Sequence, residues 1–165
     1  MMHKKISIIA ALSDNGVIGG NNQLLWHISN DLKRFKKMTT GHTVVMGKNT
    51  FLSLPVKPLP NRTNIVLSRK GFPESDQCTV VHSVEEALKL MDTEYENFVI
   101  GGGEIYRAFL PYSQKMYLTR VHKHFDGDTL FPDFSEAEWK LEHDELIVDD
   151  PQNDFAYTFQ LFVRK

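Results

Sequence analysis

Short, almost entirely apolar runs recur along the first two thirds of this chain, and segments with helical patterns lie between them. A strand that is covered on both faces of a parallel sheet has this composition, because neither of its faces meets water. Alternation of such strands with helices is typical of a parallel sheet with helices on both faces. The expected strands are Ile6–Leu12, Thr43–Met46, Asn64–Ser68, Thr79–His82 and Asn97–Ile100.

Four helices are expected between and after these strands. Ser29 or Asn30 can cap the first of them, and Ser83 with Glu86 forms a capping box for the third. The long polar segment 13–27 is expected to be a loop, and loops of that length in compact domains are usually functional or mobile. The expected helices span about 30–38, 48–54, 84–91 and 104–110.

The last third of the chain has a different pattern. A strand is expected from Met116 to Val121, and the apolar residues near the C-terminus alternate with mostly polar ones, which indicates a strand with one apolar face. We therefore expect one domain over 1–165 with an α/β fold: a mostly parallel central sheet with helices on both faces and a C-terminal antiparallel addition. The alternating residues are Phe155, Tyr157, Phe159, Leu161 and Val163.

Composition argues against several classes of function. The 165 residues carry a net charge of −2 with histidines neutral, so no global field gathers nucleic acid or an anionic membrane. No apolar run approaches the length of a membrane span. Cys78 is the only cysteine, which excludes an internal disulfide and favours a reducing cytoplasm. His122 and His124 could share a strand face, but no third ligand has suitable spacing, so no metal is expected.

The first predicted helix carries a carboxylate, Asp31, on an apolar arc of about 120°. An inward-facing carboxylate needs a partner or a raised pKa, and an acid in an apolar pocket can hold a proton near neutral pH. The helix alone favours a plainer interpretation, in which Asp31 is a first-turn acid stabilised by the helix dipole. The rest of the arc is Leu32, Phe35, Met38 and Thr39, and the basic face, which we expect to be solvated, is Lys33, Arg34, Lys36 and Lys37.

Three strand ends have features that suit a nucleotide. Gly101–Gly103 follow an apolar strand and precede a helix, where the backbone can approach a ligand and N–H groups can face a phosphate. Alone, a triple glycine is more often a tight turn, and Tyr106 stands where the dinucleotide fingerprint has its final glycine. Gly47 and Lys48 repeat the arrangement. No acid directly follows the strand before Lys48 or the strand before the basic segment 68–70. These residues instead suit an additional 2′-phosphate, which favours NADPH over NADH.

Several motifs in the same order make the chain resemble the dihydrofolate reductase family over essentially its whole length. The core of the resemblance is Gly16–Gly19 followed by Leu25–Phe35, and Val45–Phe51 is similar to the family's first cofactor segment. The resemblance implies NADPH-dependent reduction of 7,8-dihydrofolate to tetrahydrofolate, and we expect a monomer. The other matching segments are 58–62, 99–106, 117–119, 127–129 and 131–132.

The resemblance also implies roles for individual residues around the substrate. Asp31 would hydrogen-bond the pterin ring and promote protonation of N5. Thr119 would support that carboxylate, and Trp26 would lie beside it. Arg62 would pair with the glutamate carboxylate of the substrate, a bidentate task that suits a guanidinium. The remaining residues of the expected substrate pocket are Ile9, Ala10, Leu32, Phe35, Leu54 and Ile100.

For NADPH, the resemblance implies a site along the carboxyl ends of the parallel strands. In the family a cis peptide joins two central glycines, and we expect it between Gly101 and Gly102 or one bond further on. The segment 13–27 is expected to close over the site, and Asp128 to hold it through backbone N–H groups. The expected cofactor residues are Ala11, Ile18, Gly47, Lys48, Asn49, Thr50, Leu67, Ser68, Arg69, Gly101, Gly102, Gly103, Glu104, Ile105 and Tyr106.

The sequence departs from the family pattern at three positions. Leu25 and Ser29 stand where prolines are common, so the loop before the first helix is expected to be less rigid. Lys48 stands where arginine is frequent, which gives a phosphate a point charge instead of a planar fork.

Two alternatives to a dihydrofolate reductase stay open. The chain could be a related NADPH-dependent pterin or pyrimidine reductase, or a non-catalytic nucleotide-binding module. Asp31, Phe35 and Arg62 together favour folate over another heterocycle. A binding module would keep the glycines but has no need of an acid on an apolar face.

Overall fold

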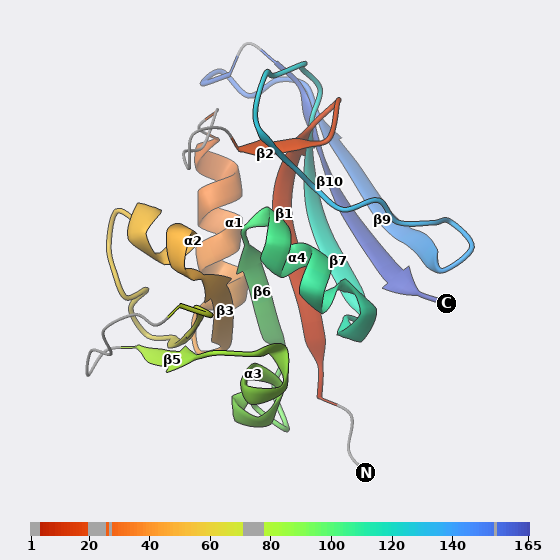
Figure 1. The fold of residues 1–165 in the computed structure, drawn as a ribbon. Coiled ribbons are helices and arrows are strands. Elements are labelled where there is room, and N and C mark those ends of the chain that lie inside the picture. The colour runs from red at the N-terminus through yellow and green to blue at the C-terminus, as the bar shows by residue number, and fades with distance from the viewer. Residues whose placement is uncertain (1–3, 20–25, 27, 71–77, 154) are drawn as a thin grey trace.

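The centre of the structure is an eight-stranded sheet with the strand order β5-β4-β3-β6-β1-β7-β10-β9 (Figure 1). The structure is a computed structural model, and it describes residues 4–19, 26, 28–70, 78–153 and 155–165. Neighbouring strands from β5 to β7 are parallel, whereas β10 is antiparallel to β7 and to β9. The strands are β1 (Ile6–Ser13), β3 (Thr43–Gly47), β4 (Thr63–Leu67), β5 (Thr79–Val81), β6 (Asn97–Gly101), β7 (Lys115–Val121), β9 (Trp139–Ile147) and β10 (Tyr157–Arg164).

Each of the five apolar runs forms a parallel strand, and helices cover both faces of the sheet. Because successive side chains of a strand point to opposite faces, the parallel strands supply two separate apolar clusters. One cluster joins Ile8 and Val99 to Phe109, and the other joins Val44 to Phe51 and Met38. The helices are α1 (Ser29–Thr39) and α2 (Lys48–Ser53) on one face, and α3 (Val84–Leu90), α4 (Gly103–Phe109) and the short η1 (Leu110–Tyr112) on the other.

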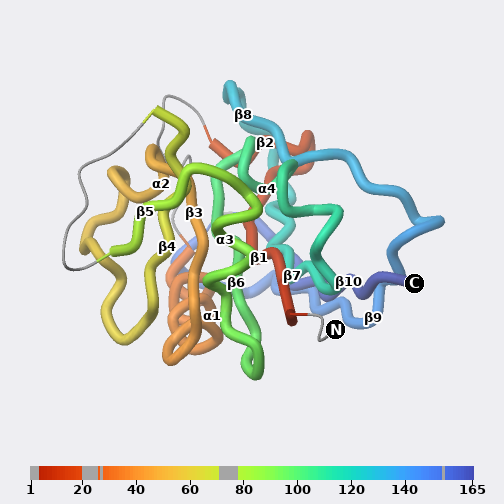
Figure 2. The backbone as a smooth tube through the Cα atoms, turned by 60° about the horizontal axis from the view of Figure 1, so that its bottom comes forward, coloured from red at the N-terminus to blue at the C-terminus, as the bar shows by residue number. Residues whose placement is uncertain are grey.

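The predicted fold class is therefore confirmed, including the antiparallel addition at the C-terminal end. In Figure 2, β10 and β9 extend the sheet beyond β7, on the side away from β4 and β5. Among the described residues, no helix is both long and apolar enough to cross a membrane.

Three local features differ from the sequence-based expectations. The segment 13–27 contains a strand, β2 (Val17–Gly19), which pairs antiparallel with β8 (Thr129–Leu130). Ile28, not Ser29 or Asn30, takes the N-cap position of α1, so the expected side-chain cap is wrong. The strand β9 was not predicted, because it forms the edge of the sheet and most of its side chains are exposed, so it lacks an apolar period.

The third helix begins with a variant of the predicted capping box. The Ser83 hydroxyl accepts a 3.1 Å hydrogen bond from the Glu86 backbone N–H, as a capping box requires. The Glu86 carboxylate, however, accepts from the backbone N–H of His82, one residue before the cap.

Candidate active site

Two glycine-bearing strand ends lie side by side at the carboxyl edge of the sheet. The strands β3 and β6 are parallel neighbours, and Met46 pairs with Gly101. The peptide bond between Gly101 and Gly102 is cis, at the first of the two expected positions. Gly101 has φ +129°, a conformation that L side chains rarely adopt, so a glycine is required here. The helices α2 and α4 begin directly after these two strands. The backbone N–H groups at both helix starts therefore lie along one edge of the sheet.

Close packing around Gly47 and Gly103 leaves no room for larger residues. A Cβ atom on Gly47 would lie 3.0 Å from Cγ1 of Ile105. A Cβ atom on Gly103 would lie 2.7 Å from Cγ2 of Thr129 and 3.8 Å from Cδ1 of Ile18. The start of α4 therefore lies directly against β2 and β8, which places the expected cofactor residues Ile18, Gly47, Gly103 and Ile105 around one stretch of backbone.

The buried Tyr106 connects two neighbouring strands at the same edge by hydrogen bonds. Its hydroxyl lies 2.8 Å from the carbonyl oxygens of both Ile9, on β1, and Ile100, on β6. Burial raises the pKa of this phenol, so it stays protonated and can act as a donor. Tyr106 thus contributes to the edge by fixing two strands to α4.

The carboxylate of Asp31 is held by a hydroxyl from the sheet. Thr119 on β7, which is only 2% exposed, donates a 2.5 Å hydrogen bond to Oδ1 of Asp31 on α1. The pairing of Thr119 with Ala11 on β1 fixes its position next to the glycine edge. Burial raises the pKa of Asp31, and the Thr119 hydrogen bond and the Arg34 charge offset part of this rise. Asp31 is therefore an acid that can carry a proton at higher pH than an exposed aspartate.

The apolar residues predicted for the substrate pocket divide between the two faces of the sheet. Ile9, Leu54 and Ile100 pack in the cluster on the α1 face, the same face as Asp31. Ala10 belongs to the cluster on the opposite face, so its side chain is separated from this group. Phe35 is half-buried on α1. Leu32 is 44% exposed, which corrects the expectation that the whole arc faces inward.

Arg62 lies at the far end of α1 and is positioned by two hydrogen bonds. Its Nε donates to the Pro60 carbonyl at 2.9 Å, and its Nη1 donates to Oγ1 of Thr39 at 3.0 Å. Of its five N–H groups, these bonds leave both on Nη2 and one on Nη1, among the described contacts. The outer end of the guanidinium can therefore still accept a carboxylate in a bidentate pair.

Comparison with known proteins agrees with this geometry. The family model "Dihydrofolate reductase" matches residues 5–164. The chain is 42% identical over 160 residues to the dihydrofolate reductase of Bacillus subtilis, covering 97% of this chain and 95% of that protein. It is 43% identical over 159 residues to that of Haemophilus influenzae, covering 96% and 98%.

The chain belongs to the dihydrofolate reductase family. A solved structure of dihydrofolate reductase from Enterococcus faecalis, complexed with NADP(H) and RAB-propyl, superposes with a TM-score of 0.90 at 33% identity. That alignment covers 100% of this chain and 99% of the other. The predicted family, fold and class of enzyme, an oxidoreductase with dihydrofolate reductase activity, are thereby confirmed.

The remaining cofactor residues expected for a dihydrofolate reductase lie at the ends of β3 and β4. Lys48 and Asn49 are exposed at the start of α2, and Arg69 is exposed just after β4. Leu67 and Ser68 are buried, and the Ser68 N–H donates to the Val81 carbonyl at 2.9 Å. The half-buried Thr50 lies near two glycines, since its Oγ1 is 3.5 Å from a Cβ built on Gly101 or on Gly102. Ala11 is half-buried on β1, and Glu104 is exposed on α4.

Trp26, expected beside the dihydrofolate reductase acid, packs in an aromatic cluster at the start of α1. Its ring centroid lies 5.0 Å from that of Phe125, and Ile28 and Tyr157 belong to the same cluster. The Asp128 carboxylate accepts a 2.9 Å hydrogen bond from the Thr129 hydroxyl. The rest of the expected closing segment, residues 20–25 and 27 with Leu25 among them, lies outside the described residues.

Arg34 is half-buried against the sheet, so its expected place on the solvated basic face of α1 in this dihydrofolate reductase is wrong. The Arg34 guanidinium lies over the ring of Phe159 on β10, 4.4 Å from its centroid. Burial lowers the pKa of Arg34, and the charges of Asp31 and Glu145 act in the opposite direction. A helical wheel cannot detect this contact, because a long side chain can reach past the edge of its own face.

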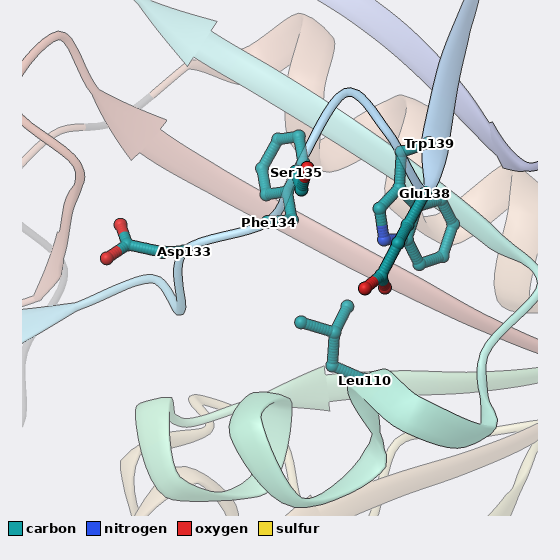
Figure 3. A pocket seen from close by; sticks show the side chains of 6 residues that line it. All are labelled: Leu110, Asp133, Phe134, Ser135, Glu138 and Trp139. Atoms are coloured by element: carbon teal, nitrogen blue, oxygen red, sulfur yellow. The ribbon is translucent and has the colours of Figure 1, made fainter.

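A separate cavity of about 330 Å³ lies on the α4 side of the sheet, away from the dihydrofolate reductase site (Figure 3). One of its lining residues, Trp139, is contacted by Arg164, whose guanidinium lies 4.4 Å from the centroid of the indole. Within the described part of the chain, no group of three or more histidine, cysteine or acidic side chains could hold a metal ion. The cavity is lined by Leu110, Asp133, Phe134, Ser135, Glu138 and Trp139.

Proposed function

We propose that this enzyme reduces 7,8-dihydrofolate to 5,6,7,8-tetrahydrofolate with NADPH, and that Asp31 is the acid that promotes protonation of N5. The observation that carries the assignment of the acid is the 2.5 Å hydrogen bond from Thr119 to a carboxylate whose pKa burial raises. A carboxyl group in such a setting is suited to proton chemistry near neutral pH. We assign this role to Asp31 because an exposed aspartate would be fully ionised near neutral pH and could not hold a proton.

The substrate would lie between α1 and the carboxyl end of β1. Asp31 would hydrogen-bond the pterin ring, and Arg62 at the other end of α1 would hold the glutamate carboxylate. Ile9, Leu54 and Ile100 share one apolar cluster and would form the wall behind the ring. Leu32 and Phe35, on the turn of α1 next to Asp31, would contact the substrate from the helix side. An apolar wall with a few convergent polar groups is the usual composition of a small-molecule site.

The glycine edge fits a dinucleotide. At Gly47 and Gly103 a Cβ atom would meet a neighbouring side chain at 3.0 Å or less, so the packing of this edge requires glycine at both positions. Gly102, Gly103, Lys48 and Thr50 would hold the pyrophosphate, and Ser68 with Arg69 would hold the phosphate on the adenosine ribose. When bound, NADPH supplies the hydride that C6 of the substrate accepts. Ala11 and Ile18 would contact its nicotinamide end.

The protein's own part in the reaction is orientation, exclusion of water and control of one proton. Thr119 keeps the Asp31 carboxylate in one orientation, and Tyr106 keeps β1 and β6 aligned behind it. The protonated carboxyl group stabilises the pterin in the form that takes up a proton at N5 from water.

An Asp31→Asn variant tests the role of the acid. We expect hydride transfer at about pH 7 to fall by at least about 100-fold, the typical contribution of a positioned acid. Activity should recover in part in acid, where a larger share of the substrate is already protonated in solution. Asp133→Asn is the matched control, because Asp133 is an exposed aspartate beside Leu110 and Trp139, on the α4 side of the sheet. Near-normal hydride transfer by Asp31→Asn at pH 7 would rule out this role.

Cofactor choice is tested by titrating the protein with NADPH and with NADH, and following binding by nucleotide fluorescence. We expect tighter binding of NADPH, and an Arg69→Gln variant should lose about tenfold in NADPH affinity but little in NADH affinity. Lys33→Gln, which removes the same charge from the exposed side of α1, should change neither. Equal loss for both nucleotides would place Arg69 outside the ribose phosphate site.

We further propose that the enzyme is a single-domain monomer of the cytoplasm. One continuous sheet from β5 to β9 supports a single cooperative unit, and a lone cysteine suits a reducing compartment. Light scattering should give a mass near the 19.0 kDa of one chain. Unfolding in urea should give one transition by both fluorescence and circular dichroism.

A further inference from the structure

Two residues one turn apart on α1 each contact the sheet through a different strand. Asp31 accepts the hydrogen bond from Thr119 on β7, and Arg34 lies over the ring of Phe159 on β10. Residues three apart on a helix lie on the same side, so the carboxylate and the guanidinium are neighbours. Their positions are therefore set by the sheet as well as by the helix.

The two contacts on the sheet are themselves adjacent. Thr119 and Phe159 are direct partners in the antiparallel pairing of β7 and β10, and partners of this kind project from the same face of a sheet. Asp31, Thr119, Phe159 and Arg34 thus form a square of four residues, joined by one hydrogen bond, one strand pairing, one cation–ring contact and one helical turn. Phe159 is also paired with Glu145 on β9, the next strand outward.

The guanidinium of Arg34 is held by an aromatic ring and not by a direct ion pair with a carboxylate of the described residues. Among the described residues it makes no direct ion pair or hydrogen bond through its guanidinium; it contacts the Phe159 ring, and the charges of Asp31 and Glu145 act on it from further away. It is half-buried, so water screens its field less than that of an exposed lysine. A cation held in this way acts on the carboxylate one helical turn away, Asp31.

We propose that Arg34 is a positioning residue for the reaction: its guanidinium, fixed over Phe159, favours the ionised form of Asp31 and so limits the pH range in which Asp31 holds its proton. This inference rests on the proposed role of Asp31 in catalysis. It assigns the pH range of the enzyme to a residue that contacts the sheet, not the expected substrate wall.

The other titratable groups around the square do not replace this effect. Tyr106 from α4 and Tyr157 from β10 both interact electrostatically with Asp31. Burial raises the pKa of each phenol, so both are neutral at the pH values at which Asp31 titrates. Burial and the neighbouring Glu96 raise the pKa of Tyr117 on β7 to about 12. Glu145 on β9 acts on Arg34 and is exposed. In the described part of the chain, Arg34 is the cation that acts on Asp31.

The test compares Arg34→Met with Arg34→Lys and with a matched control, Lys33→Met. Lys33 is an exposed cation on the same helix, so its loss changes the net charge equally without touching the square. The first measurement is the titration midpoint of the Asp31 carboxyl carbon by NMR in the ligand-free protein, with the signal assigned by its loss in Asp31→Asn. The second is the pH profile of hydride transfer under single turnover.

We expect Arg34→Met to move the Asp31 midpoint and the falling limb of the rate profile to higher pH together. Above that limb, hydride transfer should be about threefold faster than in the parent enzyme, as loss of one partly screened charge predicts. Arg34→Lys should give a smaller shift in the same direction, and Lys33→Met no shift. If Arg34→Met fails to fold, Phe159→Leu replaces it, because it keeps the cation but removes its platform and should also shift the midpoint upward.

An unchanged Asp31 midpoint in Arg34→Met, with the Asp31 signal present, overturns the inference and leaves the role of Asp31 intact. A shifted midpoint with an unshifted rate profile overturns it as well, since Asp31 would then not limit the reaction. Full activity of Asp31→Asn at neutral pH would instead remove the proposed catalytic role of Asp31, and the NMR midpoints do not depend on that result.

Discussion

Asn30 donates a 3.0 Å hydrogen bond from its side-chain amide to the hydroxyl of Tyr157. The Tyr157 ring is fully buried on β10, and its hydroxyl in turn donates a 2.6 Å hydrogen bond to Asp150, in the turn between β9 and β10. Asn30 immediately precedes Asp31. The start of α1 is therefore tied to the antiparallel part of the sheet, and the position of the acid depends on strands that lie outside the parallel core.

Replacing Tyr157 with phenylalanine keeps the buried ring and removes both hydrogen bonds. We expect the free energy of unfolding to fall by about 1 to 2 kcal/mol, because the Asn30 amide and the Asp150 carboxylate lose a partner. Urea unfolding measures the change. Tyr112→Phe is the control, since Tyr112 is 44% exposed and should change stability very little. Equal effects of the two substitutions would contradict a structural role for the Tyr157 hydroxyl.

Stability should also depend on pH through Asp31. Because burial raises its pKa in the folded chain, the folded state binds more protons than the unfolded state between the ordinary carboxyl value and the raised one. The free energy of unfolding therefore decreases as pH rises through this window, and the cost remains at higher pH. Below the window both states are protonated and the cost is absent.

The Asp31→Asn variant should accordingly be more stable than the parent at about pH 8, with the difference shrinking toward pH 4. The amide oxygen can still accept the Thr119 hydrogen bond, so the comparison isolates the charge. Urea midpoints at several pH values measure it, with Asp133→Asn as the reference for loss of an exposed charge. A difference that does not change with pH would mean that Asp31 has the same proton affinity in both states.

The parallel half of this fold could be predicted from the sequence because burial on both faces leaves a strong signal. Runs such as Val44–Met46 and Val99–Ile100 have no polar face, and they form the central strands. The strand β9 has no such signal, because an edge strand exposes most of its side chains. β8 has only two residues and is defined by its pairing with β2, which a local pattern cannot reveal.

Site residues could be predicted where the function requires one residue type. They could not be predicted where the position depends on how far a long side chain extends. The glycines after β6 and the carboxylate on α1 could be recognised because few residues can replace them. The exposure of Leu32 and the burial of Arg34 could not, since a helical wheel assigns faces by Cα angle alone. The role of Tyr157 was hidden for another reason: its partners Asn30 and Asp150 are far apart in sequence.

The methyl group of Thr129 lies where a side chain at position 103 would point, so an alanine at this position should be destabilising, and a smaller residue at position 129 should offset part of the loss. A Cβ atom on Gly103 would lie 2.7 Å from Cγ2 of Thr129, so Gly103→Ala should cost about 1 to 3 kcal/mol of stability and weaken NADPH binding. Thr129→Ser removes that methyl group and should restore part of both losses in the double variant. The Leu130 carbonyl, 3.4 Å from the same position, limits the repair.

Urea unfolding and nucleotide titration of the two single variants and the double variant form a complete cycle. Thr129→Ser alone should change either quantity very little. If the effects of the two substitutions simply add, the loss in Gly103→Ala does not come from this contact.

Arg62 should determine affinity for the glutamate part of the substrate and leave the chemical step unchanged. Two of its N–H groups are held by Pro60 and Thr39, so the outer pair can form two parallel hydrogen bonds to a carboxylate. Arg62→Lys keeps the charge but loses the fork, and we expect KM for dihydrofolate to rise about tenfold or more with kcat nearly constant. A dihydropterin without the glutamate chain should be reduced equally well by both enzymes, which separates a binding role from a general disturbance. If kcat falls in parallel for both substrates, Arg62 acts through the packing of α1, because its bond to Thr39 connects it to that helix.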